Sequence, residues 1–169
     1  GRVSRKGVMP LSWTLDHVGP MTRTVEDAAL MLHAISGFDP ADKTTSTESV
    51  SDFRSELSPD IKGLKIGILE DSFVDIHPDI EEAMERSIKV FEALGAQLCP
   101  VRIPNYRVLH IANSIIYLVE AFNNFGTRLR EDSSKLGKIF RIYGYMGGLF
   151  SADEYIQAMR LHSRTRVEV

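Results

Sequence analysis

The sequence predicts an α/β fold whose sheet is at least partly parallel and covered by helices. A short apolar segment over 64–69 precedes an amphipathic helical pattern over 78–94, and a second extended segment follows over 96–101. A strand, a helix and a strand of these lengths are typical of a crossover between two parallel strands. Further helical patterns, separated by turn-rich segments, occupy the rest of the chain and agree with the same class.

The first 23 residues contain several glycines and prolines and are expected to form short extended pieces joined by turns. A helix is predicted over 24–36. The Thr24 hydroxyl can accept the backbone N–H of Asp27, whose carboxylate can reach back to complete a capping box. Gly37 suits the left-handed position just beyond the helix end. Asp16 and Arg23 could form an ion pair, and Gly19-Pro20 fixes a turn between them.

A long polar surface loop is predicted over 38–62. Pro78 stands at the first position of the following helix, where proline is best tolerated, and Gly95 ends that helix.

The second half of the chain is predicted to be mostly helical. One helix is expected over 108–129, with Ile111, Ile115 and Leu118 among its apolar positions. A break over 131–137 and a second helix over 138–149 follow, and Gly147-Gly148 is expected to give a bend. Ser151 and Glu154 form a second capping-box pattern, which opens a third helix.

Composition excludes several classes of function. The formal net charge is −3, and the basic residues are dispersed, so no surface for nucleic acid or an anionic membrane is expected. Cys99 is the only cysteine, which rules out an internal disulfide and predicts a reducing, cytoplasmic location. The five histidines lack the spacing of metal ligands, and no apolar run is long enough to span a membrane. We therefore expect neither a metal nor a cofactor.

One short run contains residue types used in amide hydrolysis. Ser133, Ser134 and Lys135 are consecutive in the polar break between two helices, beside Glu131 and Asp132. A catalytic base must lie within hydrogen-bond reach of its nucleophile in a partly desolvated pocket. A solvated loop is therefore the favoured interpretation of this run.

The N-terminal part carries ordered motifs of a known family. Gly-Arg-Val-Ser-Arg at 1–5 is followed by Leu-Asp-x-x-Gly-Pro-x-x-Arg-Thr-Val-Glu-Asp-Ala at 15–28 and by Gly-Phe-Asp-Pro-x-Asp-x-Thr-x-Ser at 37–46. This set closely resembles the amidase-signature family. Weaker similarity continues through Gly-Leu-Lys-Ile-Gly at 63–67 and Tyr-Ile-Gln-Ala at 155–158.

The resemblance implies hydrolysis of the C–N bond of carboxylic amides by a Ser–cis-Ser–Lys triad, without a cofactor. In that family the lysine and both serines precede the Gly-Arg-Val-Ser-Arg stretch. We therefore expect residues 1–169 to be an interior part of an amidase domain, with no catalytic residue. The upstream catalytic part and a C-terminal strand would be absent, the sheet incomplete, and the isolated chain inactive. The exposed apolar surface would favour association, as in a homo-oligomer.

The resemblance also suggests which residues contact a small-molecule amide substrate. The segment over 12–16 is similar to one that runs beside the family's active site, so Trp13 and Asp16 are candidates for the substrate pocket. Turn geometry and packing are the alternative role for both. His162 is a third candidate, with an exposed helix histidine as the alternative.

Two other functions stay open. Amidotransferase A subunits resemble the same family and tend to carry Ala-Gln-x-x-Arg in the last helix, with the arginine serving the substrate carboxylate. This chain has His162 in that place, which weakens the alternative, although Arg164 could substitute if the helix register shifts. Such a protein would need partner subunits and tRNA. A non-catalytic fragment or interaction module is the alternative of another class.

Overall fold

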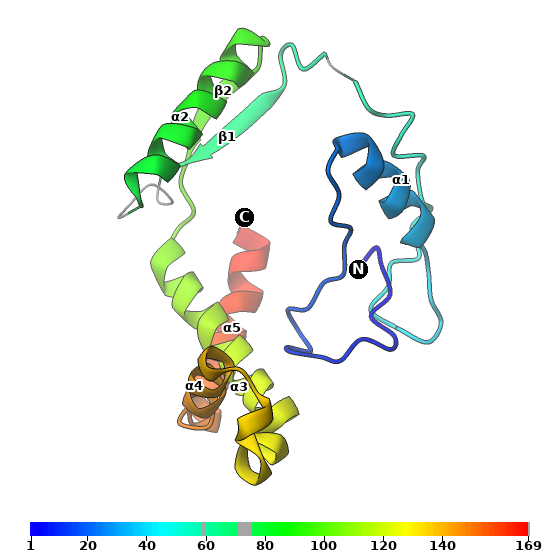
Figure 1. Ribbon diagram of the computed structural model, residues 1–169. Coiled ribbons are helices and arrows are strands. Elements are labelled where there is room, and N and C mark those ends of the chain that lie inside the picture. The colour runs from blue at the N-terminus through cyan, green and yellow to red at the C-terminus, as the bar shows by residue number, and fades with distance from the viewer. Residues whose placement is uncertain (59, 71–75, 169) are drawn as a thin grey trace. The chain divides into compact units, whose positions relative to one another are not determined.

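The computed structural model describes residues 1–58, 60–70 and 76–168. The chain divides into two compact units, one formed by 1–57 with 110–168 and the other by 58–109. Each unit is considered by itself (Figure 1). The described residues form an α/β chain that is rich in helix and has a small parallel sheet, in agreement with the predicted class and with an incomplete α/β fold.

The unit over 58–109 contains the predicted strand–helix–strand segment. Strands β1 (Lys65–Leu69) and β2 (Gln97–Val101) are parallel neighbours, and helix α2 (Pro78–Ala93) connects them. Pro78 occupies the first turn of α2, and the His77 ring accepts the backbone N–H of Asp79 at 3.3 Å. Gly95 follows α2 with a φ of 87°, which glycine adopts more easily than other residues. The parallel pairing predicted from the sequence is confirmed.

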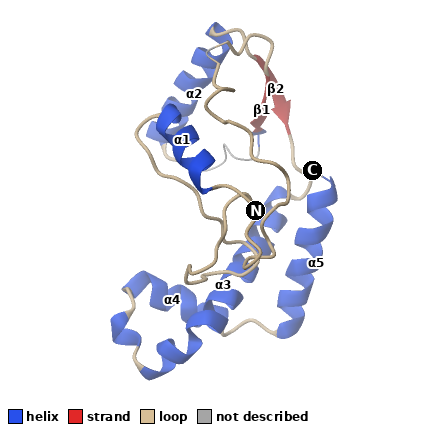
Figure 2. Ribbon diagram, turned by 90° about the vertical axis from the view of Figure 1, so that its right-hand side faces the viewer, coloured by secondary structure: helices blue, strands red, loops and turns tan. Residues whose placement is uncertain are grey.

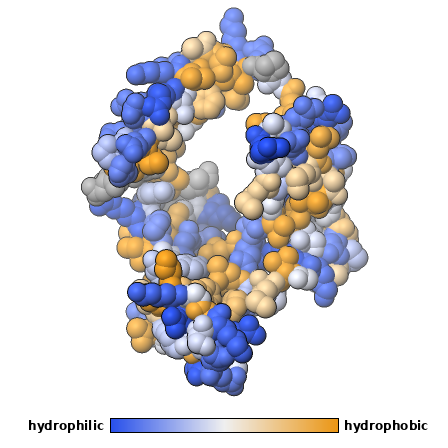
Figure 3. Space-filling model, viewed as in Figure 1, coloured by the Kyte–Doolittle hydropathy of each residue, from blue (hydrophilic) through white to orange (hydrophobic). Residues whose placement is uncertain are grey.

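Much apolar surface in this unit has no cover within it. All of α2 is described, and none of its residues is buried. Ile80, Val90 and Phe91 are among its exposed apolar side chains. Figure 3 shows hydrophobic residues (orange) at the surface. This agrees with the expectation of exposed apolar surface beside an incomplete sheet.

The unit formed by 1–57 and 110–168 contains α1 (Val25–Ile35) and the C-terminal helices. Thr24 caps α1 by accepting the backbone N–H of Asp27 at 3.1 Å, as predicted. Helix α3 covers Tyr106–Glu131, and the short 3-10 helix η2 (Ser133–Lys135) occupies the predicted break. Helix α4 (Lys138–Gly147) and helix α5 (Ala152–Glu168) follow (Figure 2). Ser151 and Glu154 form the predicted capping box at the start of α5.

The buried face of α3 agrees in part with the predicted apolar positions, since Leu118 is buried and Ile115 packs against the core. Ala112 and Ile116 pack with Ala158 of α5 in the core of the unit, while Ile111 is 59% exposed. Glu120 lies one turn beyond Ile116 on the same face and is also buried. Of the apolar positions named from the sequence, Ile111 therefore lies off the buried side of this helix, while Leu118 lies on it. Within the described residues, no helix combines the length and apolar character of a membrane span.

Two glycines of α4 allow its close contact with α3. A Cβ placed on Gly144 would lie 2.8 Å from Leu129 Cδ1, and one placed on Gly147 would lie 1.9 Å from the backbone oxygen of Leu118. The second distance cannot be relieved by rotating a side chain. Gly147-Gly148 was expected to give a bend between helical segments, and α4 does end at Gly147, with Gly148 as its C-cap. Gly147 is in addition a packing contact with α3.

We therefore predict that Gly147→Ala destabilises the chain strongly. Adding atoms to a packed contact costs about 1–3 kcal/mol, and the upper end is expected here because backbone must move. Urea unfolding followed by circular dichroism measures the loss. Gly137→Ala is the control, since its added Cβ would meet no described atom within 4 Å. Equal stability of the two variants would contradict the close approach of α3 and α4.

Candidate functional site

A buried carboxylate on α3 holds the segment that contains two of the predicted site residues. Glu120 is 6% exposed and accepts the Ser12 hydroxyl at 2.5 Å. It also accepts the backbone N–H and the hydroxyl of Thr14, at 3.0 and 2.9 Å. The fourth donor is the Tyr155 hydroxyl of α5, at 2.8 Å. One carboxylate thus joins the N-terminal segment, α3 and α5.

The ionisation of this cluster follows from its bonds. Desolvation by itself would raise the pKa of Glu120, but the hydrogen bonds from Ser12, Thr14 and Tyr155 outweigh it, and the pKa is lowered. Desolvation and the bond to this carboxylate raise the pKa of Tyr155 to about 12. At neutral pH Glu120 is therefore charged and Tyr155 is a neutral donor. This cluster is organised to hold structure and has no acceptor free for proton transfer.

One turn further along α3, a second side chain contacts the same segment. The Trp13 indole N–H donates to Asn124 Oδ1 at 3.0 Å. Asn124 Nδ2 donates in turn to the backbone oxygen of Leu11 at 3.1 Å. Residues four apart lie on one face of a helix, so Glu120 and Asn124 together contact four consecutive residues, 11–14.

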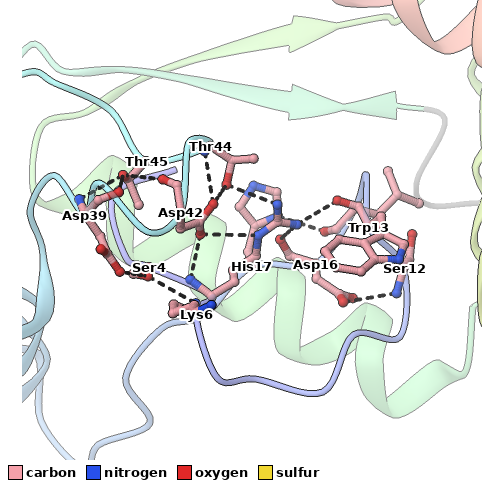
Figure 4. Close-up of polar contacts among 12 residues, drawn as sticks. Ser4, Lys6, Ser12, Trp13, Asp16, His17, Asp39, Asp42, Thr44 and Thr45 are labelled. Carbon is pink, nitrogen blue, oxygen red and sulfur yellow. Dashed lines mark hydrogen bonds and ion pairs between the residues drawn. The ribbon is translucent and has the colours of Figure 1, made fainter. Parts of the chain in front are cut away.

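Arg5, in the Gly-Arg-Val-Ser-Arg motif at 1–5, also contacts the segment that contains Trp13. Its guanidinium donates to the backbone oxygens of Trp13 and Asp16, at 2.7 and 3.4 Å. It also donates to Thr44 Oγ1 at 3.0 Å and lies 3.8 Å from the Asp42 carboxylate. Figure 4 shows these contacts. Arg5 therefore links the 37–46 loop to the Trp13 segment.

The same loop fixes the backbone around Arg5. Asp42 accepts the backbone N–H of Arg5 at 2.8 Å, and Asp39 accepts the Ser4 hydroxyl at 2.6 Å. Hydrogen bonds from Thr44, and then from the Arg5 backbone, lower the pKa of Asp42 to about 2. Both aspartates are charged at neutral pH and act as acceptors for the 1–5 segment.

Two of the three predicted site residues lie together. Trp13 is 59% exposed and lines, with Asp16, a surface pocket of about 200 Å³. The Asp16 carboxylate accepts the backbone N–H groups of Leu11 and Ser12, at 2.8 and 3.0 Å. These bonds stabilise a turn, and an ion pair with Arg23 is absent among the described residues. The Asp16 carboxylate thus serves as an acceptor for backbone N–H groups.

The third candidate lies elsewhere. His162 of α5 is half-buried, and its Nδ1 lies 2.9 Å from Asn113 Oδ1 of α3. Asn113 precedes Asn124 by eleven positions, which corresponds to roughly 16 Å along the helix. His162 does not line the pocket beside Trp13. Arg164 follows at two positions, which points it about 200° around α5 from His162, so it cannot replace His162 in this register.

Of the consecutive Ser133, Ser134 and Lys135, the last two bind the carboxylate of Asp132. Ser134 Oγ donates to Asp132 Oδ1 at 2.5 Å, and Lys135 Nζ lies 3.0 Å from Asp132 Oδ2. The Ser134 and Lys135 bonds lower the pKa of Asp132. Lys135 is exposed and paired as a cation, so it does not serve as a base for either serine. The solvated-loop interpretation agrees with this geometry.

The sequence did not point to Glu120, Asn124 or Tyr155 as organising residues. Glu120 gave a usable signal, since it stands four positions after Ile116, in phase with the buried face of α3. A charged residue in that phase predicts a buried, hydrogen-bonded carboxylate. No group of three or more histidine, cysteine or acidic side chains that would suit a metal is found in the described part of the chain.

Comparison with known proteins defines the class. The model of the family described as Amidase matches residues 1–164. The chain therefore belongs to the amidase family, in agreement with the amidase-signature motifs of its first 46 residues.

Individual relatives and a solved structure extend the match. An amidase from Pseudomonas putida is 40% identical over 96% of this chain and 35% of the relative. The A subunit of a glutamyl-tRNA(Gln) amidotransferase from Akkermansia muciniphila is 41% identical over 99% of this chain and 33% of the relative. A chain from an inhibitor-bound vestigial protein complex, described as revealing the origins of an s-triazine catabolic enzyme, superposes with a TM-score of 0.88. The two are 29% identical, and the match covers all of this chain and 36% of that one. The chain thus spans about a third of these proteins.

We predict that Glu120→Gln lowers the free energy of unfolding at neutral pH by about 2 kcal/mol, because charge-assisted hydrogen bonds are lost. The pKa of Glu120 is lower in the folded chain than in the unfolded chain. Its ionised carboxylate therefore stabilises the fold at every pH above the unfolded-state pKa, and this stabilisation is lost as the pH falls through the folded-state pKa. The stability difference from the parent chain should therefore narrow in acid. Denaturant unfolding at a series of pH values measures it. Glu131→Gln is the control on the same helix, because Glu131 is exposed. A gap that stays constant with pH would refute the role of the charge.

Proposed function

We propose that this chain is an interior part of an amidase that hydrolyses the C–N bond of carboxylic amides with a Ser–cis-Ser–Lys triad. The match to the amidase family over residues 1–164 carries the proposal. The triad would lie outside the 169 residues. The bonds of Ser134 and Lys135 to Asp132 support this, since they leave Lys135 paired with a carboxylate and offer no activated nucleophile.

Within the complete enzyme, this chain would supply scaffold and one wall of the substrate pocket. Trp13 and Asp16 line one pocket and are held by α3 and by Arg5, which supports a place for both beside the substrate. His162 remains a prediction for the pocket, with its bond to Asn113 as the alternative role. No cofactor is proposed, and the enzyme is expected to act in the cytoplasm.

A second candidate function is that of an amidotransferase A subunit, favoured by the 41% identity to the Akkermansia protein of that name. The resemblance leads us to expect an arginine in α5 at the position of His162 in an A subunit. Arg164 does not replace it, because it points to a nearly opposite side of α5. We therefore place hydrolysis first. A non-catalytic interaction module is the third candidate, and the exposed apolar residues support self-association.

The proposal predicts that the purified 169-residue chain hydrolyses no amide, while the full-length protein releases ammonia from small carboxylic amides. Ammonia release across a panel of aliphatic and aromatic amides measures both. Turnover by the isolated chain that survives repeated purification would refute the location of the triad. Glutamine-dependent amidation that appears only with partner subunits and tRNA would favour the second candidate. Inactivity of the full-length protein in both assays would favour the interaction module.

A further inference from the structure

We propose that Glu120 and Asn124 act as a clamp that fixes Trp13, so that the pocket beside it binds an apolar group of the amide substrate. This inference rests on the proposed hydrolysis for its substrate class. Both residues are positioning residues: they contact the pocket wall and not the substrate.

Both residues of the clamp lie on one face of α3 and bind the segment over 11–14. Glu120 takes the hydroxyl of Ser12 and two donors of Thr14, the neighbours of Trp13 on either side. Asn124 takes the indole N–H of Trp13 itself and binds the backbone oxygen of Leu11. Ser12 is 2% exposed, so the backbone beneath Trp13 is anchored in the interior while the indole ring stays at the surface.

An anchored but exposed tryptophan needs a physical reason. Ordering a large side chain at the surface loses conformational entropy and gains little burial. Fixing it in advance is favourable where a ligand later covers it, because the ordering does not then reduce the affinity. Trp13 is 59% exposed, yet its indole nitrogen, its neighbours and its backbone oxygen all have partners.

The pocket indicates the chemistry of that ligand. Most of its lining is apolar and comes from a single turn-rich segment: Val8, Met9, Pro10, Leu11, Trp13 and Val18. Its polar members are Arg5, Asp16 and His17. Arg5 binds backbone oxygens, Asp16 binds backbone N–H groups, and His17 Nδ1 lies 2.8 Å from the Leu15 backbone oxygen. A volume of about 200 Å³ suits an aryl or branched alkyl group, and the aromatic face of Trp13 favours an aryl group.

A fluorescence experiment on the 169-residue chain tests the clamp. Trp13 is the only tryptophan, so its emission reports on this site alone. We expect Asn124→Ala to lower the residual anisotropy of Trp13, and Glu120→Gln to shift it in the same direction, with helix content retained by circular dichroism. Asn123→Ala is the matched control, because that side chain is exposed and makes no hydrogen bond within the described residues. Anisotropy equal to the control in both variants would overturn the clamp.

Kinetics of the full-length protein test the substrate class. For benzamide we expect Asn124→Ala to raise KM roughly fivefold, the equivalent of one net hydrogen bond, with kcat little changed. For acetamide, which lacks an apolar group of this size, KM should stay unchanged. Equal KM increases for both amides would overturn the pocket assignment, because a general loss of structure affects both.

The two arms also separate this inference from the proposed hydrolysis. If the unmutated full-length protein cleaves neither amide, the proposed hydrolysis fails. Quenching of Trp13 fluorescence in the 169-residue chain then tests the pocket separately. Quenching by benzamide but not by acetamide would support binding of an aryl amide, and equal quenching by both would refute the pocket assignment.

Discussion

The ionised carboxylate of Glu120 is the interaction on which the larger unit depends. Its four hydrogen bonds connect Ser12 and Thr14, near the N-terminus, to α3 and to Tyr155 of α5. A buried charge is tolerated only when its acceptor sites are filled, so each donor must keep its place. The donors come from two segments and the carboxylate from a third, all far apart in sequence, so satisfying one carboxylate fixes the arrangement of all three.

The geometry of α3 and α5 repeats this principle. Glu120 pairs with Tyr155, and Asn113 pairs with His162, so seven positions along one helix correspond to seven in the reverse direction along the other. Seven residues are nearly two full turns, which keeps both pairs on one face of antiparallel helices. The small core of Ala112, Ile116 and Ala158 lies on the same contact. Polar pairs therefore set the register, and small apolar residues fill the space between them.

Local patterns predicted much of this fold, and interactions between distant residues account for the rest. The N-cap at Thr24, the capping box at Ser151, Pro78 at the start of α2 and the parallel strands follow from short-range rules, which the sequence displays directly. Of the apolar positions named on α3, Leu118 is buried and Ile111 is exposed, because the face that meets α5 holds Ala112 and Ile116. The roles of Glu120 and Asn124 were not predicted, because their partners Ser12 and Trp13 lie far away in the sequence. The packing role of Gly147 depends on the backbone oxygen of Leu118, which lies beside it in space and 29 positions away in sequence, so no local pattern predicts it.

The motifs that resemble the amidase-signature family acquire a physical meaning in this network. Ser4 and Arg5 of the first motif bind Asp39 and Asp42 of the third, and Arg5 continues to the backbone of Asp16 in the second. The first motif thus supplies hydrogen-bond donors, and the third supplies the charged carboxylates that accept them. Replacing Ser4 would leave the carboxylate of Asp39 without this donor. The pocket wall at Trp13 lies where this network meets the Glu120 cluster of α3. Residues that do not contact a substrate can therefore be as restricted in side-chain type as residues that do, because they determine the position of the pocket wall.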